Sequence, residues 1–226
     1  MRVAFLLFPN VTQLDLTGPA QVLSRLGGAA RVDLVWKTRE PVMTDAGFAI
    51  VPTATFDEVP AADVLCVPGG PGTNAVIADE AALGWVRQAG EQATWVTSVC
   101  TGSLILGAAG LLRGYRAACH WTMREHLPLF GAEPVAERVV VDRNRVTGGG
   151  VTAGIDFALT LTALIRGEAH ARGVQLALEY DPAPPFDSGS PERAGPELTE
   201  AVRERGRKAM PGRVDELRAL AERLGS

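Results

Sequence analysis

Cysteine is scarce in this chain, and that scarcity excludes two kinds of architecture. Only three cysteines occur, Cys66, Cys100 and Cys119, and no two of them form a close Cys-x-x-Cys pair. An odd number at such spacing argues against a disulfide framework and against a thiolate metal site. The three histidines are also spread along the sequence. We therefore expect no metal site.

The chain also lacks a strong charge imbalance and a long apolar run. Its formal net charge is −4 at pH 7, and the charges are distributed along the sequence. Such a distribution provides no basic surface for nucleic acid or for an anionic membrane. No apolar run has the length needed to cross a bilayer. The apolar N-terminus ends at Pro9 without a small-residue cleavage site, so it predicts a first strand and a cytoplasmic protein.

What is present is an alternation of strand and helix patterns over 226 residues, enough for one large α/β domain. Strand patterns cover residues 2–8, 31–36, 64–68, 94–99, 115–118, 138–141 and 145–147, with a small hairpin at 41–52. Helical patterns cover residues 14–26, 80–92, 152–165 and 168–180, and a further apolar helix follows Cys100. The alternation predicts an open, mostly parallel sheet with helices on both faces.

The C-terminal part has a different composition. Residues 181–195 are rich in proline, glycine and serine, which predicts a loop or arm. The residues that follow are mostly charged and helical, with Pro211-Gly212 between two segments. We therefore expect one α/β domain over residues 1–190, and over residues 191–226 a charged helical tail that is too short for an independent domain.

The most informative segment is residues 94–107, in which a β-rich run becomes an apolar helical run at Cys100. This is the layout of a nucleophile elbow, a tight strand-to-helix turn that exposes one reactive side chain. The helix N-terminus is expected to lower the Cys100 pKa and favour the thiolate. The alternative is a buried structural cysteine, but the strand–cysteine–glycine–helix context favours a working thiol.

Two other segments also follow predicted strands. Gly69 and Gly70 come after the buried strand at 64–68, where backbone N–H groups can stabilise developing negative charge; a plain turn is the alternative. Asp15 lies between leucines at the start of the first helix, as a helix cap or as a general acid with a raised pKa. Because ligands bind beyond the carboxyl ends of parallel strands, these residues and Cys100 are expected at one edge of the sheet.

Three further residues are candidates for support of the site. His120 is the one histidine in an apolar setting, and it either orients Cys100 or is a satisfied core histidine, which we favour. Gly150 belongs to a second glycine-rich turn, whose backbone is expected to pass close to the elbow. Thr152 follows as an expected helix cap.

Taken together, these motifs resemble the ThiJ/PfpI superfamily. The motifs that carry the resemblance are Phe8-Pro9, Asp15–Pro19, Pro68–Gly70, Val99–Gly102, His120-Trp121 and Gly148–Asp156. The resemblance extends from Met1 to about Pro191, and it implies a flavodoxin-like α/β fold similar to class I glutamine amidotransferases. Residues 97–103 and 178–186 are most similar to the members of the superfamily that hydrate isonitriles.

The resemblance implies hydration of an isonitrile to an N-substituted formamide by a homodimer, without metal or organic cofactor. It implies that Cys100 is the nucleophile and that Asp15, from the first strand–helix turn, touches it. Thr101 stands where the protease-like and glyoxalase-like branches usually have histidine. Another cysteine-dependent amidase, a glyoxalase or a non-catalytic small-molecule sensor remain alternatives. Regulators with a similar domain carry a DNA-binding module after it, and none is expected in this chain.

Overall fold

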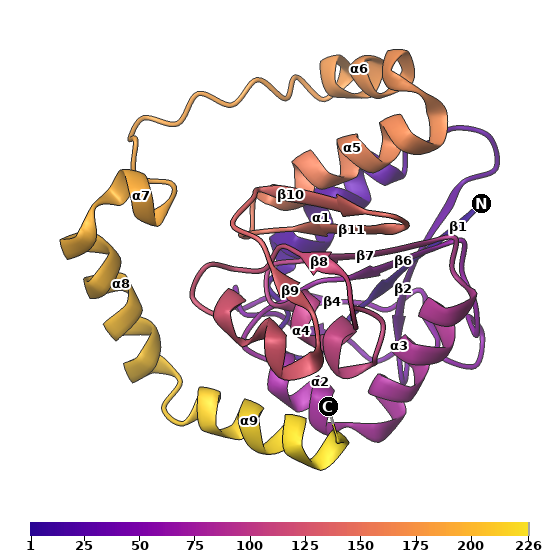
Figure 1. Cartoon of the computed structure of the whole chain (residues 1–226). Coiled ribbons are helices and arrows are strands. Elements are labelled where there is room, and N and C mark those ends of the chain that lie inside the picture. Colours follow the sequence, from indigo (N-terminus) through magenta and orange to yellow (C-terminus); the bar gives the residue numbers. More distant parts are fainter. Residues whose placement is uncertain (226) are drawn as a thin grey trace.

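A seven-stranded sheet forms the centre of the protein in the computed structural model, which describes residues 1–225 (Figure 1). In spatial order its strands are β10 (Val139–Asp142), β11 (Arg145–Gly148), β7 (Trp95–Val99), β6 (Val64–Val67), β1 (Arg2–Leu6), β2 (Arg31–Trp36) and β5 (Ala54–Thr55). All neighbouring pairs are parallel except β10–β11. The expected open, mostly parallel sheet is confirmed.

Helices cover both faces of the sheet (Figure 1). They are α1 (Gln13–Leu23), α2 (Thr73–Ala78), α3 (Glu80–Gln92), α4 (Gly102–Ala108), α5 (Ala153–Arg166) and α6 (Glu168–Ala177). Helices α1, α5 and α6 pack together on one side, and α2, α3 and α4 pack on the other. Because both faces are covered, a central strand such as β6 is buried at all four of its positions, Val-Leu-Cys-Val.

Several short elements differ from the expectations. The hairpin at 41–52 is confirmed as β3 (Val42–Met43) paired with β4 (Ala49–Ile50). The pattern at 115–118 pairs as β8 (Arg116–Ala117) with an unpredicted strand, β9 (Glu133–Pro134), in a separate small sheet. Strand β5, helix α2 and the 3-10 helix η1 (Arg124–Phe130) were also not predicted. They are too short to show a period, and Pro128 interrupts the helical pattern of η1.

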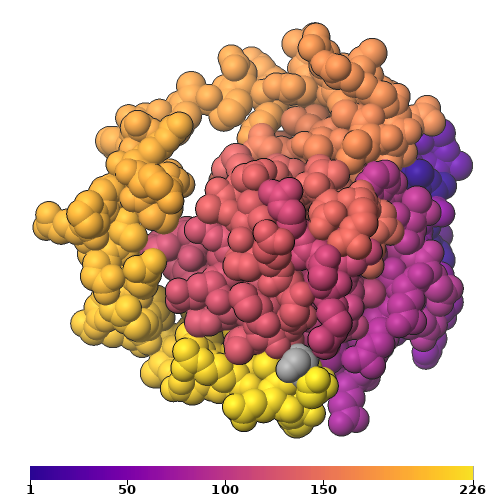
Figure 2. Space-filling model, viewed as in Figure 1, coloured from indigo at the N-terminus to yellow at the C-terminus, as the bar shows by residue number. Residues whose placement is uncertain are grey.

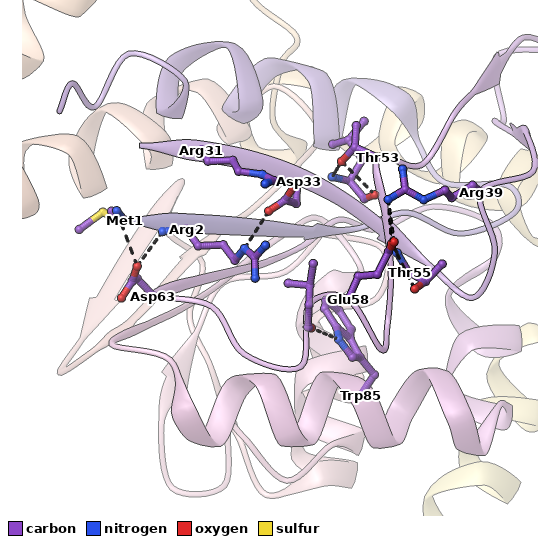
Figure 3. Close-up of polar contacts among 12 residues, drawn as sticks. Met1, Arg2, Arg31, Asp33, Arg39, Thr53, Thr55, Glu58, Asp63 and Trp85 are labelled. Atoms are coloured by element: carbon purple, nitrogen blue, oxygen red, sulfur yellow. Dashed lines mark hydrogen bonds and ion pairs between the residues drawn. The ribbon is translucent and has the colours of Figure 1, made fainter. Parts of the chain in front are cut away.

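Near the amino ends of β1 and β2, charged side chains tie the strands together (Figure 3). Asp33 is 1% exposed and forms ion pairs with Arg2 at 2.9 Å and with Arg31 at 2.7 Å. Asp63 accepts a hydrogen bond from the Arg2 backbone N–H at 2.6 Å, which connects β1 to the start of β6. This cluster stabilises the end of the sheet opposite the candidate site.

The tail consists of three helices, α7 (Pro191–Ala194), α8 (Pro196–Ala209) and α9 (Arg213–Leu224). The loop expected over residues 181–195 is an extended arm over residues 181–190, but the prediction is wrong for its last part, because α7 is helical. Figure 2 shows an opening between this arm and the body of the protein. Neither α7 nor α8 has a buried residue, whereas α9 buries Leu217, Leu220 and Ala221 against the core beside α2 and η1. The tail therefore returns to the domain at its last helix.

Across residues 1–225, no helix combines the length and the apolar character needed to cross a membrane.

Candidate active site

Cys100 lies in a strained turn between β7 and α4. Its φ angle is +58°, a left-handed conformation that non-glycine residues rarely adopt. The Cys100 backbone N–H donates to the Gly148 carbonyl at 3.1 Å, and its carbonyl accepts from the His120 N–H at 3.2 Å. A Cβ on Gly102 would lie 2.0 Å from the Val67 carbonyl oxygen, so only glycine fits where the helix begins. The structure thus has the geometry expected of a nucleophile elbow.

The Asp15 carboxyl lies beside this thiol and is fully buried, with 0% exposure. Its Oδ2 accepts a hydrogen bond from the Gly69 N–H at 2.9 Å. Its Oδ1 is buried and has no hydrogen-bond partner among residues 1–225. The N-cap residue of α1 is Thr12, and Asp15 bonds across to Gly69 rather than to its own helix. The helix-cap interpretation of Asp15 is therefore wrong.

Burial raises the pKa of Asp15 to about 7, and the contacts with the Gly69 N–H and the Cys100 thiol oppose that rise. The expected rise is confirmed. At neutral pH the carboxyl is therefore close to the midpoint of its titration, which is the range in which a general acid can also act as a base.

The expected fall in the Cys100 pKa is wrong, because burial instead raises this pKa well above its ordinary value. The negative charge of Asp15 raises the pKa further, and the neighbouring Cys119 thiol does the same. The Thr101 N–H lowers it, but this contribution from the helix N-terminus is smaller than that of burial. Cys100 is only 5% exposed, so water stabilises its thiolate little. The ground state is a neutral thiol beside a titrating carboxyl.

The two glycines expected to form an oxyanion site already have partners inside the protein. The Gly69 N–H donates to Asp15, and the Gly70 N–H donates to Thr101 Oγ1 at 2.9 Å. Thr101 Oγ1 also lies 2.7 Å from Thr73 Oγ1, and Thr73 donates to the Gly70 carbonyl at 2.8 Å. These backbone groups therefore position the side chains of the site, and the Thr101 backbone N–H is the donor that faces the Cys100 sulfur.

The other predicted residues lie around the elbow without a side-chain bond to Cys100 in the described chain. His120 Nδ1 pairs with Thr122 Oγ1 at 2.8 Å, and burial together with the charge of Arg213 lowers the His120 pKa. A Cβ on Gly150 would lie 3.8 Å from the His120 ring, so Gly150 borders that histidine. His120 contacts the elbow through its backbone, as expected of a satisfied histidine.

Thr152 precedes α5 as the N-cap residue, but its side chain makes no capping hydrogen bond. Its Oγ1 instead accepts from Arg138 Nη2 at 3.2 Å. The prediction that Thr152 caps the helix through its side chain is therefore wrong, although Thr152 occupies the N-cap position. The close approach of the second glycine-rich turn to the elbow is confirmed, although Gly148 rather than Gly150 makes the contact.

Sequence reasoning did not identify three residues that lie at this site. Thr73 and Cys119 are buried, and Arg213 donates from its Nη2 to the Gly70 carbonyl at 3.0 Å. Thr73 directly follows the glycine-rich turn, and this position in the sequence could have identified it as a neighbour of the site. Nothing in the sequence places Arg213 beside Gly70, because 143 residues separate them.

A hollow of about 520 Å³ lies near the amino end of β7, and no cysteine lines it. Its arginines already bind backbone carbonyls that follow α4: Arg87 Nε donates to Ala109 at 3.2 Å and Arg145 Nε to Leu111 at 2.7 Å. Residues 1–225 contain no group of three or more His, Cys, Asp or Glu side chains placed to hold a metal ion. The buried cluster around Cys100 and Asp15 is therefore the site with reactive groups.

The chain is similar in sequence to several known proteins. The sequence profile of the DJ-1/PfpI family matches residues 1–164. Isonitrile hydratase of Pseudomonas putida is 50% identical over 224 residues, which cover 99% of this chain and 98% of that protein. A glutathione-independent glyoxalase of Caenorhabditis elegans is 24% identical, over 74% of this chain and 90% of that protein.

Among solved structures, a ThiJ/PfpI family protein from Pseudomonas syringae superposes with a TM-score of 0.89. It is 45% identical, and the match covers 97% of this chain and 90% of that one. The similarity therefore includes the C-terminal tail as well as the α/β domain.

Proposed function

The chain belongs to the DJ-1/PfpI family, and from that premise we propose that it is an isonitrile hydratase, which converts R–N≡C and water into the N-substituted formamide R–NH–CHO. The observation that carries the proposal is the pairing of a strained, buried Cys100 with Asp15, whose Oδ1 has no partner among residues 1–225. The 50% identity over nearly the full length of the Pseudomonas putida enzyme supports the substrate class.

The first half of the reaction uses the single proton that Cys100 and Asp15 hold between them. Transfer of the thiol proton to Asp15 creates the thiolate, which attacks the terminal carbon of the isonitrile. Asp15 then delivers that proton to the same carbon, and a thioimidate, R–N=CH–S–Cys100, forms. The carboxyl is left ionised. A pKa of about 7 suits this exchange, because both directions of proton transfer are then accessible.

The second half consumes the water. Ionised Asp15 takes a proton from water as its oxygen adds to the thioimidate carbon, and Asp15 then passes that proton to the nitrogen. The resulting R–NH–CH(OH)–S–Cys100 collapses when Asp15 removes the hydroxyl proton and the C–S bond breaks. Formamide leaves, and the pair again holds one proton.

We propose that the remaining groups position this pair. Gly69 orients Asp15 through its N–H, and Thr101 holds Gly70 through its hydroxyl. The Thr101 N–H stabilises negative charge on the sulfur. His120, Gly150 and Thr152 support the surrounding turns. None of these steps calls for a metal or an organic cofactor.

We also propose that the enzyme is a homodimer in the cytoplasm. Two-fold symmetric dimers are the commonest oligomers. Helix α8 has no buried residue, and it exposes the apolar side chains of Leu198 and Val202. All three cysteines are unpaired, which fits a reducing compartment. Light scattering at micromolar concentration tests the assembly: a mass of about twice 23.9 kDa supports it, and the mass of one chain contradicts it.

A substrate panel tests the activity. Wild-type protein and the Cys100→Ala variant are assayed with cyclohexyl isocyanide, methylglyoxal and simple amides. We expect formamide from the isocyanide with wild-type protein alone. Turnover of amides but not of the isocyanide selects an amidase, turnover of methylglyoxal selects a glyoxalase, and no turnover with any of them favours a sensor.

A further inference from the structure

The last helix of the chain reaches the turn at Gly70, beside the Cys100 site. Arg213 is the first residue of α9, and its Nη2 donates to the Gly70 carbonyl at 3.0 Å. The Arg213 carbonyl accepts from Asn74 Nδ2 at 2.9 Å, and Asn74 also donates to Glu216 at 2.7 Å. Both ends of Arg213 are therefore attached to the segment that follows β6, on the side of the elbow.

The Arg213 guanidinium donates to the Gly70 carbonyl and to Met210 Sδ, and one of its nitrogens is left without a partner in the described chain. Its Nε is buried and has no hydrogen-bond partner among residues 1–225. A buried guanidinium N–H without an acceptor is costly, so its presence calls for an explanation. The helix that holds Arg213 is fixed to the core by Leu217, so the guanidinium does not move freely.

The charge of Arg213 acts on the titratable side chains around Cys100. Burial lowers the pKa of Arg213, and negative charge on Cys100 or Cys119 would raise it. Arg213 in turn lowers the pKa of His120. The other charged or titratable groups around these residues are Asp15 beside Cys100, Arg124 near Cys119, and Glu216 on α9.

We propose that Arg213 is a positioning residue of the Cys100 site, which fixes the Gly70 turn and supplies the positive charge that favours the thiolate at the moment of attack. The first role follows from the hydrogen bonds, because the Gly70 peptide accepts from Arg213 and donates to Thr101. The second role follows from the electrostatics of the site. Burial and the charge of Asp15 disfavour the Cys100 thiolate. A thiolate at Cys100 would raise the pKa of Arg213, and because this attraction is mutual, the charge of Arg213 favours the thiolate.

The best test separates the charge from the hydrogen bond and does not depend on isonitrile turnover, although the catalytic role rests on the proposed function. Arg213→Gln keeps an amide donor for the Gly70 carbonyl and removes the charge, whereas Arg213→Lys keeps the charge. Arg218→Gln is the matched control, because Arg218 lies on the same helix, is exposed and pairs with Asp215. Alkylation of Cys100 by iodoacetamide is measured against pH, with mass spectrometry to separate the three cysteines.

We expect the midpoint of Cys100 alkylation to rise by about one pH unit in Arg213→Gln, so that alkylation near neutral pH is about tenfold slower. Arg213→Lys and Arg218→Gln should retain midpoints close to that of wild type. With isonitrile substrate, kcat should fall in Arg213→Gln while KM changes little. A wild-type midpoint in a folded Arg213→Gln protein would overturn the proposal.

Two further results remain interpretable. If wild-type protein does not turn over isonitriles but the midpoint still shifts in Arg213→Gln, the proposed function fails and the role of Arg213 stands. If Arg213→Gln does not fold, Arg213→Lys decides the hydrogen-bond role: normal alkylation with reduced kcat supports it, and unchanged kcat contradicts it.

Discussion

Two buried aspartates lie near opposite ends of the same sheet, and their surroundings differ. Asp33, near the amino ends of β1 and β2, is 1% exposed and pairs with two guanidinium groups, those of Arg2 and Arg31 (Figure 3). Asp15, beyond the carboxyl ends, is 0% exposed and accepts only one backbone N–H, from Gly69. Burial raises the pKa of Asp15 to about 7.

The difference shows how equal burial leads to two kinds of residue. A carboxylate with two cations beside it is compensated, and its ion pairs hold strands together. A carboxylate without a cation keeps its desolvation cost, which makes its proton available near neutral pH. Burial alone therefore does not distinguish the reactive aspartate from the structural one. What distinguishes Asp15 is that it lacks a neighbouring cation among residues 1–225 and lies beside the strained Cys100.

The largest effect should come from removing the thiol that makes the Asp15 end reactive. We expect Cys100→Ala to lose isonitrile turnover by roughly a thousandfold or more, because the nucleophile is gone. Cys66→Ala is the matched control, since Cys66 is buried in β6 and its sulfur accepts a hydrogen bond from Thr97 alone among residues 1–225. It should keep most of the activity. Steady-state kinetics decide the matter, and near-normal turnover by Cys100→Ala ends the nucleophile hypothesis.

The comparison between the two aspartates is tested by the same substitution at each. Asp15→Asn keeps the shape and the acceptor for Gly69 but cannot transfer a proton, so kcat should fall on the order of a hundredfold or more. Asp33→Asn should leave kcat unchanged, because Asp33 lies away from the pocket. Equal losses in the two variants would show that the contrast has no catalytic meaning.

The pH dependence of the wild-type rate sharpens the assignment of Asp15. Below a pH of about 7 both the carboxyl and the thiol are protonated, and no nucleophile is available. Above it the pair holds one proton, which is the reactive state. We therefore expect kcat/KM to rise about tenfold per unit at acidic pH and to level off above about 7. A rate that is independent of pH between 5 and 8 would contradict the shared-proton mechanism.

The final comparison concerns stability, where the two aspartates should respond in opposite directions. The pKa of Asp15 is raised from 3.8 to about 7, so the folded state binds this proton more strongly than the unfolded state. Its contribution to folding is full below the lower value and is lost as pH rises towards the higher one. At pH 8, Asp15→Asn should therefore be more stable than wild type, on the order of a few kcal/mol, with less gain at pH 5.

Asp33→Asn provides the opposite case. The substitution removes the ion pairs of Asp33 with Arg2 and Arg31, and we expect the free energy of unfolding to fall by about 1–3 kcal/mol. Denaturation at several pH values measures both variants. Destabilisation by Asp15→Asn at pH 8 would mean that its carboxyl is structural after all.

Much of the fold could be predicted because its signals are local. Strand β2 and helix α3 begin and end at the predicted residues, since both carry clear periods over several residues. The strand expected at 2–8 ends at Leu6, and Pro19 lies inside α1, where chain context overrides the local signal. Short elements such as α2 and η1 depend on tertiary packing, and a sequence period cannot reveal them.

The sequence by itself determined the alternation of strands and helices along the chain, the strand-to-helix turn at Cys100 and the placement of Asp15 and Gly69 at one edge of the sheet. Each follows from patterns within a few residues and from the rule that parallel strands end on the same side. Only the tertiary structure decided the protonation behaviour and the hydrogen-bond partners of the site residues. It turned the Gly69 and Gly70 N–H groups towards Asp15 and Thr101, raised the pKa of the thiol, and brought Arg213 to Gly70. Desolvation and long-range pairing depend on which residues surround a group in space, and the neighbouring residues in the sequence do not reveal this.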